Sequence, residues 1–369
     1  MANTKEINER IEHYKREITV TPDNAEAYIN LGILYNSQRN YTEAIKAYKK
    51  AIAIKPSFVE AYYTLGVTLF NAGMHEDAIS FYEKAIHLDP TFSAAYYNIG
   101  VIYSHNGSLD KAVTAYELSV KHKPDFAEAH YNLALAYNRL KRYENAKASY
   151  NNAIKHKPDF AQAYYNLGGV YSTLLQFEDA IEAYNKTIEI DPKFVQAYYN
   201  LGHAFSALKH HKKAIAVYEK ALEAYPQYPE VLNNMGLEYY ELADYEKAAE
   251  MFNRALGVNS NFPEAHYNLG LTFFAQHKND EAIKAYENAL AINPEFAEAH
   301  FNIGFVRFSM NMFNEAIAAY SQAIKLNPQF AEAYYNMSMA YSQIRNEHEA
   351  IKALNEAVRL KPEIKNRKN

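Results

Sequence analysis

Asparagine recurs in this sequence at intervals of 34 residues, and its carboxamide is a group that can bind a peptide backbone. The side chain carries both hydrogen-bond donors and an acceptor, so a row of them can hold an extended chain whatever its side chains. Asparagine is a mediocre helix former, so helix propensity does not explain the row. An alternative is that each carboxamide bonds to a neighbouring unit and belongs to the fold. Thr64 interrupts the series, whose members are Asn30, Asn98, Asn132, Asn166, Asn200, Asn234, Asn268, Asn302 and Asn336.

Aromatic residues precede most of these asparagines. Tyrosine combines a large apolar ring with a polar end, so the row could form a wall for peptide side chains. Packing between units is the alternative interpretation. The residues are Tyr63, Tyr97, Tyr131, Tyr165, Tyr199, Tyr267, Phe301 and Tyr335. Four residues before the asparagine position, glutamate occurs in seven units, with an unbroken run at Glu230, Glu264, Glu298 and Glu332. These acids indicate either a rim for a basic ligand or the ordinary acids of helix N-termini.

Catalytic and metal-binding patterns are missing from the sequence. The chain has no cysteine, and it contains no glycine-rich phosphate loop, nucleophile elbow or metal-binding motif. His122 and His156 lie one interval apart, as do His266 and His300, but metal ligands must converge on one point. The segment Lys209–Lys213 is interpreted as a solvated turn between helices, with at most a weak anionic contact. We expect no enzyme activity, no cofactor and no metal.

Charge and hydropathy limit the classes of partner. A formal charge of −5 argues against nucleic acid, which usually requires a basic surface. The first ten residues are polar and do not resemble a secretory signal. No apolar run approaches the roughly 20 residues that span a bilayer, so membrane insertion is not expected. The lack of cysteine fits a cytoplasmic location.

The asparagine and aromatic rows belong to a repeat of 34 residues, numbered here from position 1 at Ala25. Position 20 is alanine in all ten copies, position 8 is glycine in eight, position 24 is aromatic in nine and position 32 is proline in nine. Apolar residues at positions 4, 7, 8 and 11, and again at 20, 24, 27 and 28, have helical spacing. Small residues let two helices approach closely, and proline ends the second. Each copy is therefore predicted to be a pair of antiparallel helices, and the fold is all-α. One pair cannot bury its apolar faces alone, so the copies must stack as an α-solenoid.

The pattern of aromatic 4, Leu 7, Gly 8, Tyr 11, Ala 20, Tyr 24, Ala 27 and Pro 32 resembles the tetratricopeptide repeat family. The resemblance implies a right-handed superhelix with a concave groove lined by the first helix of each repeat, and a role as scaffold, adaptor or cochaperone. It implies a capping half-repeat at 1–24 and a tail at 365–369. Between them lie ten repeats covering 25–364: 25–58, 59–92, 93–126, 127–160, 161–194, 195–228, 229–262, 263–296, 297–330 and 331–364.

The asparagine row resembles the ladder of the superhelical repeat domain of O-linked N-acetylglucosamine transferases. No glycosyltransferase domain is present, so the resemblance implies binding and not transfer. A repeat domain that clamps a terminal carboxylate of a chaperone would carry Lys or Arg at positions 5 and 2, where this chain has mostly Tyr and Glu. The expected function is a protein-interaction scaffold that binds a peptide or partner protein along the concave groove, using the asparagine and aromatic rows.

Two other functions follow from the ends of the array. Arg10 and Glu17 replace small residues in the first half-repeat, whereas Ala350 and Ala357 keep the last repeat ready to pack. Weak self-association through the C-terminal repeat, as a structural assembly module, is therefore one alternative. A regulatory arm of a larger enzyme, such as a glycosyltransferase, is the other.

At the starts of the first helices, Ser57, Asp125 and Asn261 each precede a glutamate by three residues and are predicted to form capping boxes.

Overall fold

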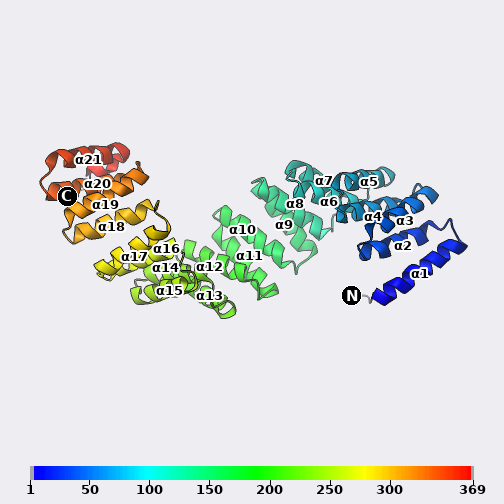
Figure 1. The fold of residues 1–369 in the computed structure, drawn as a ribbon, viewed down its shortest axis with the longest axis horizontal. Helices are drawn as coiled ribbons and strands as arrows, with labels where there is room; N and C mark the ends of the chain where they lie inside the picture. Colours follow the sequence, from blue (N-terminus) through cyan, green and yellow to red (C-terminus); the bar gives the residue numbers. More distant parts are fainter. Residues whose placement is uncertain (1–3, 367–369) are drawn as a thin grey trace. The chain divides into compact units, whose positions relative to one another are not determined.

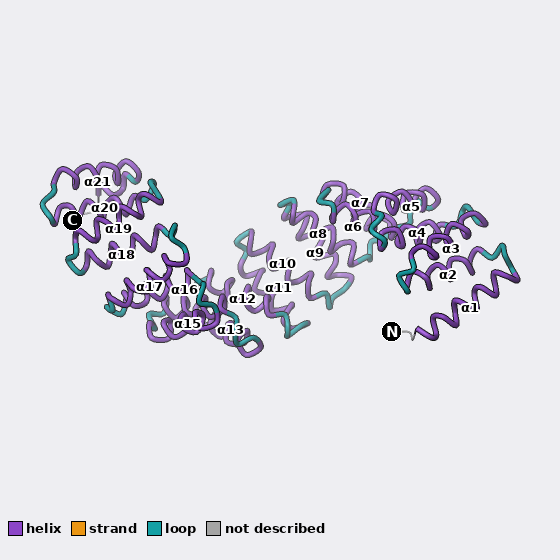
Figure 2. The backbone as a smooth tube through the Cα atoms, in the orientation of Figure 1, coloured by secondary structure: helices purple, strands orange, loops and turns teal. Residues whose placement is uncertain are grey.

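The computed structural model describes residues 4–366, and these residues form helices joined by short turns (Figures 1 and 2). Within that range there are twenty-one α-helices and one short 3₁₀ turn, and no strand. The all-α solenoid of helix pairs predicted from the repeat is confirmed. The chain divides into an N-terminal unit, Met1–Ile190, and a C-terminal unit, Asp191–Asn369.

The N-terminal unit begins with one helix and continues with five helix pairs. From α2 onward, even-numbered helices are the first helix of a repeat and odd-numbered helices are the second. Within this unit, each helix packs against the next one in the chain. The helices are α1 (Thr4–Val20), α2 (Ala25–Ser37), α3 (Tyr41–Ile54), α4 (Val59–Asn71), α5 (His75–Leu88), α6 (Ser93–His105), α7 (Leu109–His122), α8 (Ala127–Arg139), α9 (Tyr143–His156), α10 (Ala161–Thr173) and α11 (Phe177–Ile190).

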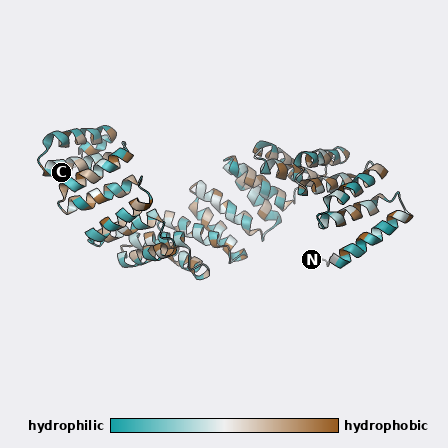
Figure 3. Cartoon of the chain, viewed as in Figure 1, coloured by the Kyte–Doolittle hydropathy of each residue, from teal (hydrophilic) through white to brown (hydrophobic). Residues whose placement is uncertain are grey.

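The C-terminal unit contains five more pairs built in the same way. Figure 3 shows hydrophilic and apolar residues along these helices, as amphipathic pairs require. None of the helices described in either unit is both long and apolar enough to cross a membrane. The elements are α12 (Val195–Ala207), α13 (His211–Ala224), α14 (Pro229–Glu241), α15 (Tyr245–Val258), α16 (Pro263–Ala275), α17 (Asn279–Ile292), α18 (Ala297–Ser309), α19 (Phe313–Leu326), α20 (Ala331–Gln343), α21 (Glu347–Leu360) and η1 (Pro362–Asn366).

Within a repeat, the two helices meet at the small residues that the sequence marked. Ala180, at position 20, is fully buried. A Cβ atom added to Gly168, at position 8, would lie 2.6 Å from Cε1 of Tyr184 at position 24. The ring of position 24 therefore occupies the space that a side chain at position 8 would need. This explains why position 8 is restricted to glycine, alanine and serine in the ten repeats.

The turn between the two helices contains a feature that the sequence did not predict. The residue at position 15 has a positive φ in every repeat, although it is glycine only at Gly73 and Gly107. For other residues this left-handed conformation places Cβ too close to the following carbonyl oxygen. The non-glycine residues, with φ between 57° and 61°, are Arg39, Lys141, Leu175, Lys209, Ala243, His277, Asn311 and Arg345.

The predicted capping boxes are wrong. The residues that cap α4, α8 and α16 are Phe58, Phe126 and Phe262, and none of them accepts a side-chain capping bond. The polar residue expected to cap lies one residue too early, because a turn at position 31 has already shifted the chain. The backbone N–H groups of Phe58 and Phe126 close this turn by donating to the carbonyls of Lys55 and Lys123, each at 3.1 Å.

The two ends of the array are covered differently. Ile11 of α1 is buried against Leu31 and Leu34, while Arg10 is exposed as expected for a terminal helix. At the other end, the segment after Pro362 folds as η1 and buries Ile364 in the cluster that contains Ala331 and Ala357, leaving only 2% of Ile364 exposed.

Candidate functional site: the face of the first helices

In five repeats, the aromatic ring at position 5 packs inside its own repeat. The ring of Tyr97 lies between Tyr116 at position 24 and Phe126 at position 34, with centroid separations of 5.9 and 4.9 Å. Such tilted contacts are favourable for aromatic pairs. The rings of Tyr63, Tyr131, Tyr267 and Phe301 make the same pair of contacts in their repeats. These rings therefore form part of the packed surface on the face of the first helices.

The hydroxyl of position 5 joins its repeat to the next one. Asn132 donates a hydrogen bond from Nδ2 to the Tyr97 hydroxyl at 2.9 Å. We call this combination, position 5 of one repeat and position 6 of the next, the junction pair. The same bond joins Asn98 to Tyr63 at 3.2 Å, Asn166 to Tyr131 at 3.0 Å and Asn302 to Tyr267 at 2.9 Å. The interpretation that the asparagines bond a neighbouring repeat is thus correct for these four, and for Asn268, whose partner is a different residue type.

The other asparagines have different surroundings. Asn268 donates to Oδ1 of Asn233, which replaces tyrosine at position 5, at 3.0 Å. Asn234 accepts a hydrogen bond from Nδ2 of the adjacent Asn233 at 3.4 Å, and Asn336 is half-buried. Asn200, on α12, is half-buried, as are Tyr165, Tyr199 and Tyr335 of the aromatic row, and Asn30 lines a hollow described below. Contact with a ligand remains a prediction for all nine.

The hydrogen bond of the junction pair leaves both the asparagine carboxamide and the tyrosine hydroxyl able to form further hydrogen bonds. Asn132 is half-buried, so part of its carboxamide is accessible, and Nδ2 uses one of its two N–H groups on Tyr97. Burial raises the pKa of Tyr97, with the nearby Glu128 acting in the same direction. The hydroxyl therefore stays protonated at neutral pH. Because its oxygen accepts from Asn132, its own hydrogen can be donated elsewhere. The pair can thus offer a donor and an acceptor to a peptide backbone.

The glutamates at position 2 differ in whether a lysine neutralises them. Lys157 lies 3.1 Å from Glu128, and Lys361 lies 2.8 Å from Glu332. The pKa of Glu128 is lowered, first by a backbone hydrogen bond and then by Lys157. Glu264 and Glu298 are exposed, and the corresponding residues at position 31 are Asn293 and Asn327. Glu264 and Glu298 therefore have no lysine at position 31 to neutralise them.

A hollow of about 530 Å³ opens on this face between repeats 1 and 2. It is bounded by residues at positions 2, 5, 6 and 9, which were expected to face a ligand, together with the two phenylalanines at position 34 that precede α4 and α6. Ile29 and Thr64 stand there in place of the tyrosine and asparagine of the other junction pairs. Thr64 was visible in the sequence as an exception, but the hollow was not predicted from it.

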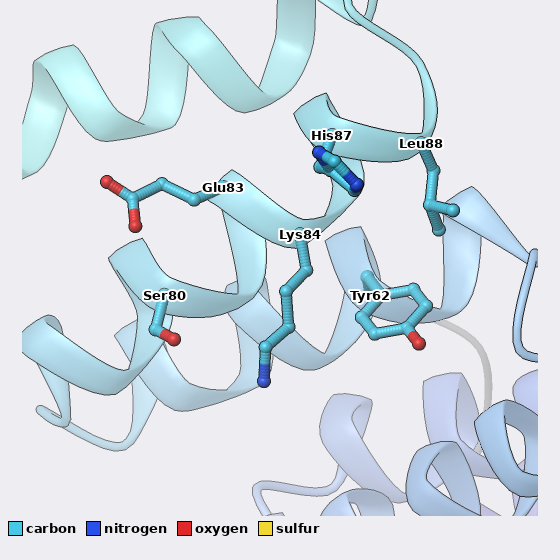
Figure 4. A pocket seen from close by; sticks show the side chains of 6 residues that line it. All are labelled: Tyr62, Ser80, Glu83, Lys84, His87 and Leu88. Atoms are coloured by element: carbon cyan, nitrogen blue, oxygen red, sulfur yellow. The ribbon is translucent and has the colours of Figure 1, made fainter.

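The opposite face, formed with the second helices, carries a hollow of about 340 Å³ beside α5. In Figure 4, Tyr62 of α4 and Lys84 point into the same space, whereas Glu83 points away from both. Lys84 Nζ lies 4.4 Å from the ring centre of Phe81. No nucleophile and base are brought together there. Among residues 4–366, no group of three or more His, Asp or Glu side chains is placed to hold a metal ion.

One contact of a buried carboxylate was not predicted from the sequence. Glu238, at position 10 of repeat 7, has a side chain only 4% exposed, and one carboxylate oxygen lies 2.7 Å from Nδ1 of His211. The interpretation of Lys209–Lys213 as a solvated turn is therefore wrong for His211, which lies at the start of α13. A single carboxylate at a position that is apolar or threonine in the other repeats was the available signal.

Sequence comparison identifies the repeat. Models described as "TPR repeat" match residues 34–73, 102–141, 176–209, 236–277, 270–311 and 306–344. Models described as "Tetratricopeptide repeat" match 59–92 and 127–160, 195–228 and 331–364, and 13–46 and 81–114. No curated protein matches the chain.

Several solved structures are similar to parts of the chain. MamA is 29% identical, with a TM-score of 0.42, over 44% of this chain and 95% of MamA. YrrB, described as a TPR protein with an unusual peptide-binding site, is 26% identical, with a TM-score of 0.42, over 49% of this chain and 94% of YrrB. A chain of the Cut9–Hcn1 assembly is 15% identical, with a TM-score of 0.49, over 97% of this chain and 91% of that one.

Proposed function

Because the chain belongs to the tetratricopeptide repeat family, we propose that it is a scaffold that binds an extended peptide or partner segment along the face of its first helices. Repeat arrays of this kind present a long surface on which successive repeats place equivalent side chains. The ligand would lie across positions 2, 5, 6 and 9 of consecutive repeats, and no cofactor or metal is needed for such binding.

The observation that supports this proposal is the junction pair. A tyrosine hydroxyl that accepts from Nδ2 fixes the plane of the asparagine carboxamide before any ligand arrives. Asn98, Asn132 and Asn166 are held in this way on three consecutive first helices. A preorganised group loses less conformational freedom on binding than a mobile one. The bond between repeats thus supports ligand contact and does not exclude it.

A random library of displayed linear dodecapeptides tests the proposal. Peptides enriched on the full chain would be synthesised, and their affinities measured by fluorescence anisotropy. We expect the combined Asn98→Ala, Asn132→Ala and Asn166→Ala variant to bind at least tenfold more weakly, since each lost hydrogen bond costs about 0.5–1.5 kcal/mol. Its melting temperature should fall only modestly.

The matched control changes Asn152 and Asn185 to alanine. Both are exposed on second helices, α9 and α11, so their loss should leave peptide affinity unchanged. Equal loss of affinity in the control and the test variant, or no enriched peptide at all, would contradict binding along the first helices.

Self-association is a second candidate, favoured by one observation. On α21, Ile351 is 59% exposed and Leu354 is 38% exposed. Their exposure in one helix gives an apolar surface on which a second copy could pack. Light scattering across concentrations tests this directly: a mass that rises for the natural chain but not for Ile351→Glu supports it, and a constant monomer mass contradicts it.

A further inference from the structure

The hollow between repeats 1 and 2 opens where the junction pair is absent. In repeats 2 to 4, the tyrosine ring fills the space between the rings of positions 24 and 34, and its hydroxyl bonds to the next repeat. Ile29 has neither the ring nor the hydroxyl. Thr64 is too short to reach across, and its hydroxyl bonds instead to the Glu60 carbonyl of its own helix at 2.7 Å. Two small substitutions therefore leave a space of about 530 Å³.

The walls of this hollow are mostly apolar. Ile29 is 7% exposed, and Ile33, one turn later, is 46% exposed. Phe58, Tyr63 and Phe92 complete the apolar part of the lining. A space of this size accommodates a large aliphatic or aromatic side chain, and contact with these residues would remove its surface from water.

The rim of the hollow carries two carboxylates and one lysine beside them, so its net charge is negative. Glu26 and Glu60, in the first turns of α2 and α4, belong to the lining and are exposed. No lysine or arginine lines the hollow; Lys55, next to it, has Nζ 4.5 Å from the ring centre of Phe58. Two carboxylates beside an apolar cavity are complementary to a ligand that carries an apolar side chain next to a positive charge.

We propose that this hollow is the anchor pocket for the bound peptide, and that it takes a large apolar side chain whose neighbour in the peptide is lysine or arginine. The inference rests on the proposed function, because the peptide must lie along the first helices. It adds a register: repeats 3 to 5 contact the backbone through fixed carboxamides, while the junction of repeats 1 and 2 selects one side chain. The Asn–Tyr junctions are indifferent to peptide sequence, so selectivity must come from such a break in the row.

The sharpest test fills the hollow with the residues used elsewhere in the array. Ile29→Tyr combined with Thr64→Asn restores the common junction pair and should keep or raise the melting temperature. Peptides enriched from the dodecapeptide library on the natural chain should contain an apolar–basic pair. We expect their affinity to fall about tenfold or more on the filled variant, as the loss of one buried apolar side chain implies.

Charge reversal tests the rim separately. Glu26→Lys with Glu60→Lys should weaken the same peptides, and this loss should diminish at high salt. Glu83→Lys, on an exposed residue of the opposite face, is the matched control and should have little effect.

The outcomes separate this inference from the proposed function. Peptides that lose affinity on the alanine variant at positions 98, 132 and 166 but bind the filled variant normally would overturn the pocket and leave the scaffold function standing. An enriched pattern without an apolar–basic pair would also overturn the pocket. Absence of any enriched peptide would overturn both.

Discussion

The junction of repeats 3 and 4 and the junction of repeats 1 and 2 are built from the same positions but end in different surfaces. In the first, Tyr97 fills the floor and accepts a hydrogen bond from Asn132 at 2.9 Å. In the second, Ile29 and Thr64 make no such bond, and a hollow of about 530 Å³ takes its place. A repeat array can therefore create a local cavity without any insertion, by changing one residue on each side of a junction.

The comparison also shows that the asparagine row has a structural role that its spacing alone does not reveal. The bond from Asn132 to Tyr97 stabilises the contact between repeats and orients the group available for a ligand. Because of these two roles, removing the tyrosine hydroxyl and removing the asparagine carboxamide should have different effects. Loss of the tyrosine hydroxyl should affect stability and orientation, whereas loss of the carboxamide should also remove the ligand contact.

The largest effect is expected at a third kind of junction, between repeats 6 and 7. His211→Ala would leave the Glu238 carboxylate buried without its partner, which should reduce the free energy of unfolding by about 3 kcal/mol. Glu238→Ala should cost much less, because Ala136, Ala204 and Ala340 occupy the same position in other repeats. Urea unfolding of both variants measures this asymmetry. Equal losses would show that the pair acts only through its mutual attraction.

Adjacent glycines sharpen the comparison within a repeat. Gly168→Leu should destabilise the protein by about 1–3 kcal/mol, as overpacking does, because Tyr184 already occupies the space above it. Gly169→Leu should stabilise it by a few tenths to 1 kcal/mol, since an added Cβ meets nothing within 4 Å and leucine is the better helix former. Thermal melting distinguishes them. Similar shifts for both variants would mean that the two helices do not cross closely at Gly168.

The fold was predictable from the sequence because its determinants repeat in every copy. Alanine at position 20 and glycine at position 8 indicated a close helix crossing, and the structure places the ring of position 24 against it. The left-handed residue in the turn was not predictable in the same way. Position 15 holds Arg, Gly, Lys, Leu, Ala, His or Asn, so the conformation is imposed by the two flanking helices and leaves no consistent residue type.

The candidate site was predictable in part. The rows at positions 5 and 6 were evident, but each was considered alone, and their connection lies between one repeat and the next. Ile29 is the only aliphatic residue at position 5, and Thr64, one repeat later, is the only exception at position 6. That coincidence is the available signal for the junction pair. For the Glu238–His211 contact, the carboxylate at position 10 was visible in the sequence as an exception, but its partner in the preceding repeat was not.

A substitution at position 15, in the turn between the two helices of a repeat, should change stability by a smaller amount. Leu175 is 74% exposed and has φ of 59°, so Leu175→Gly loses little packing and relieves the left-handed strain. We expect a gain of about 1 kcal/mol, from the strain of a side chain in this conformation offset by the entropy of glycine. Gly73→Leu, at the same position of repeat 2, should produce the opposite shift in melting temperature. A loss on Leu175→Gly would show that the turn stabilises its leucine in another way.

The junction pair itself is tested most directly by a double-mutant cycle on Tyr97→Phe and Asn132→Ala, with stability measured by urea unfolding. If the hydroxyl and the carboxamide bond to each other, the double variant should lose less free energy of unfolding than the sum of the two single losses. The difference, which is the coupling energy, should be about 0.5–1.5 kcal/mol. The control cycle pairs Tyr97→Phe with Asn30→Ala, two repeats away, and should give additive losses. Additive losses in the first cycle as well would contradict the claim that the asparagine row joins one repeat to the next.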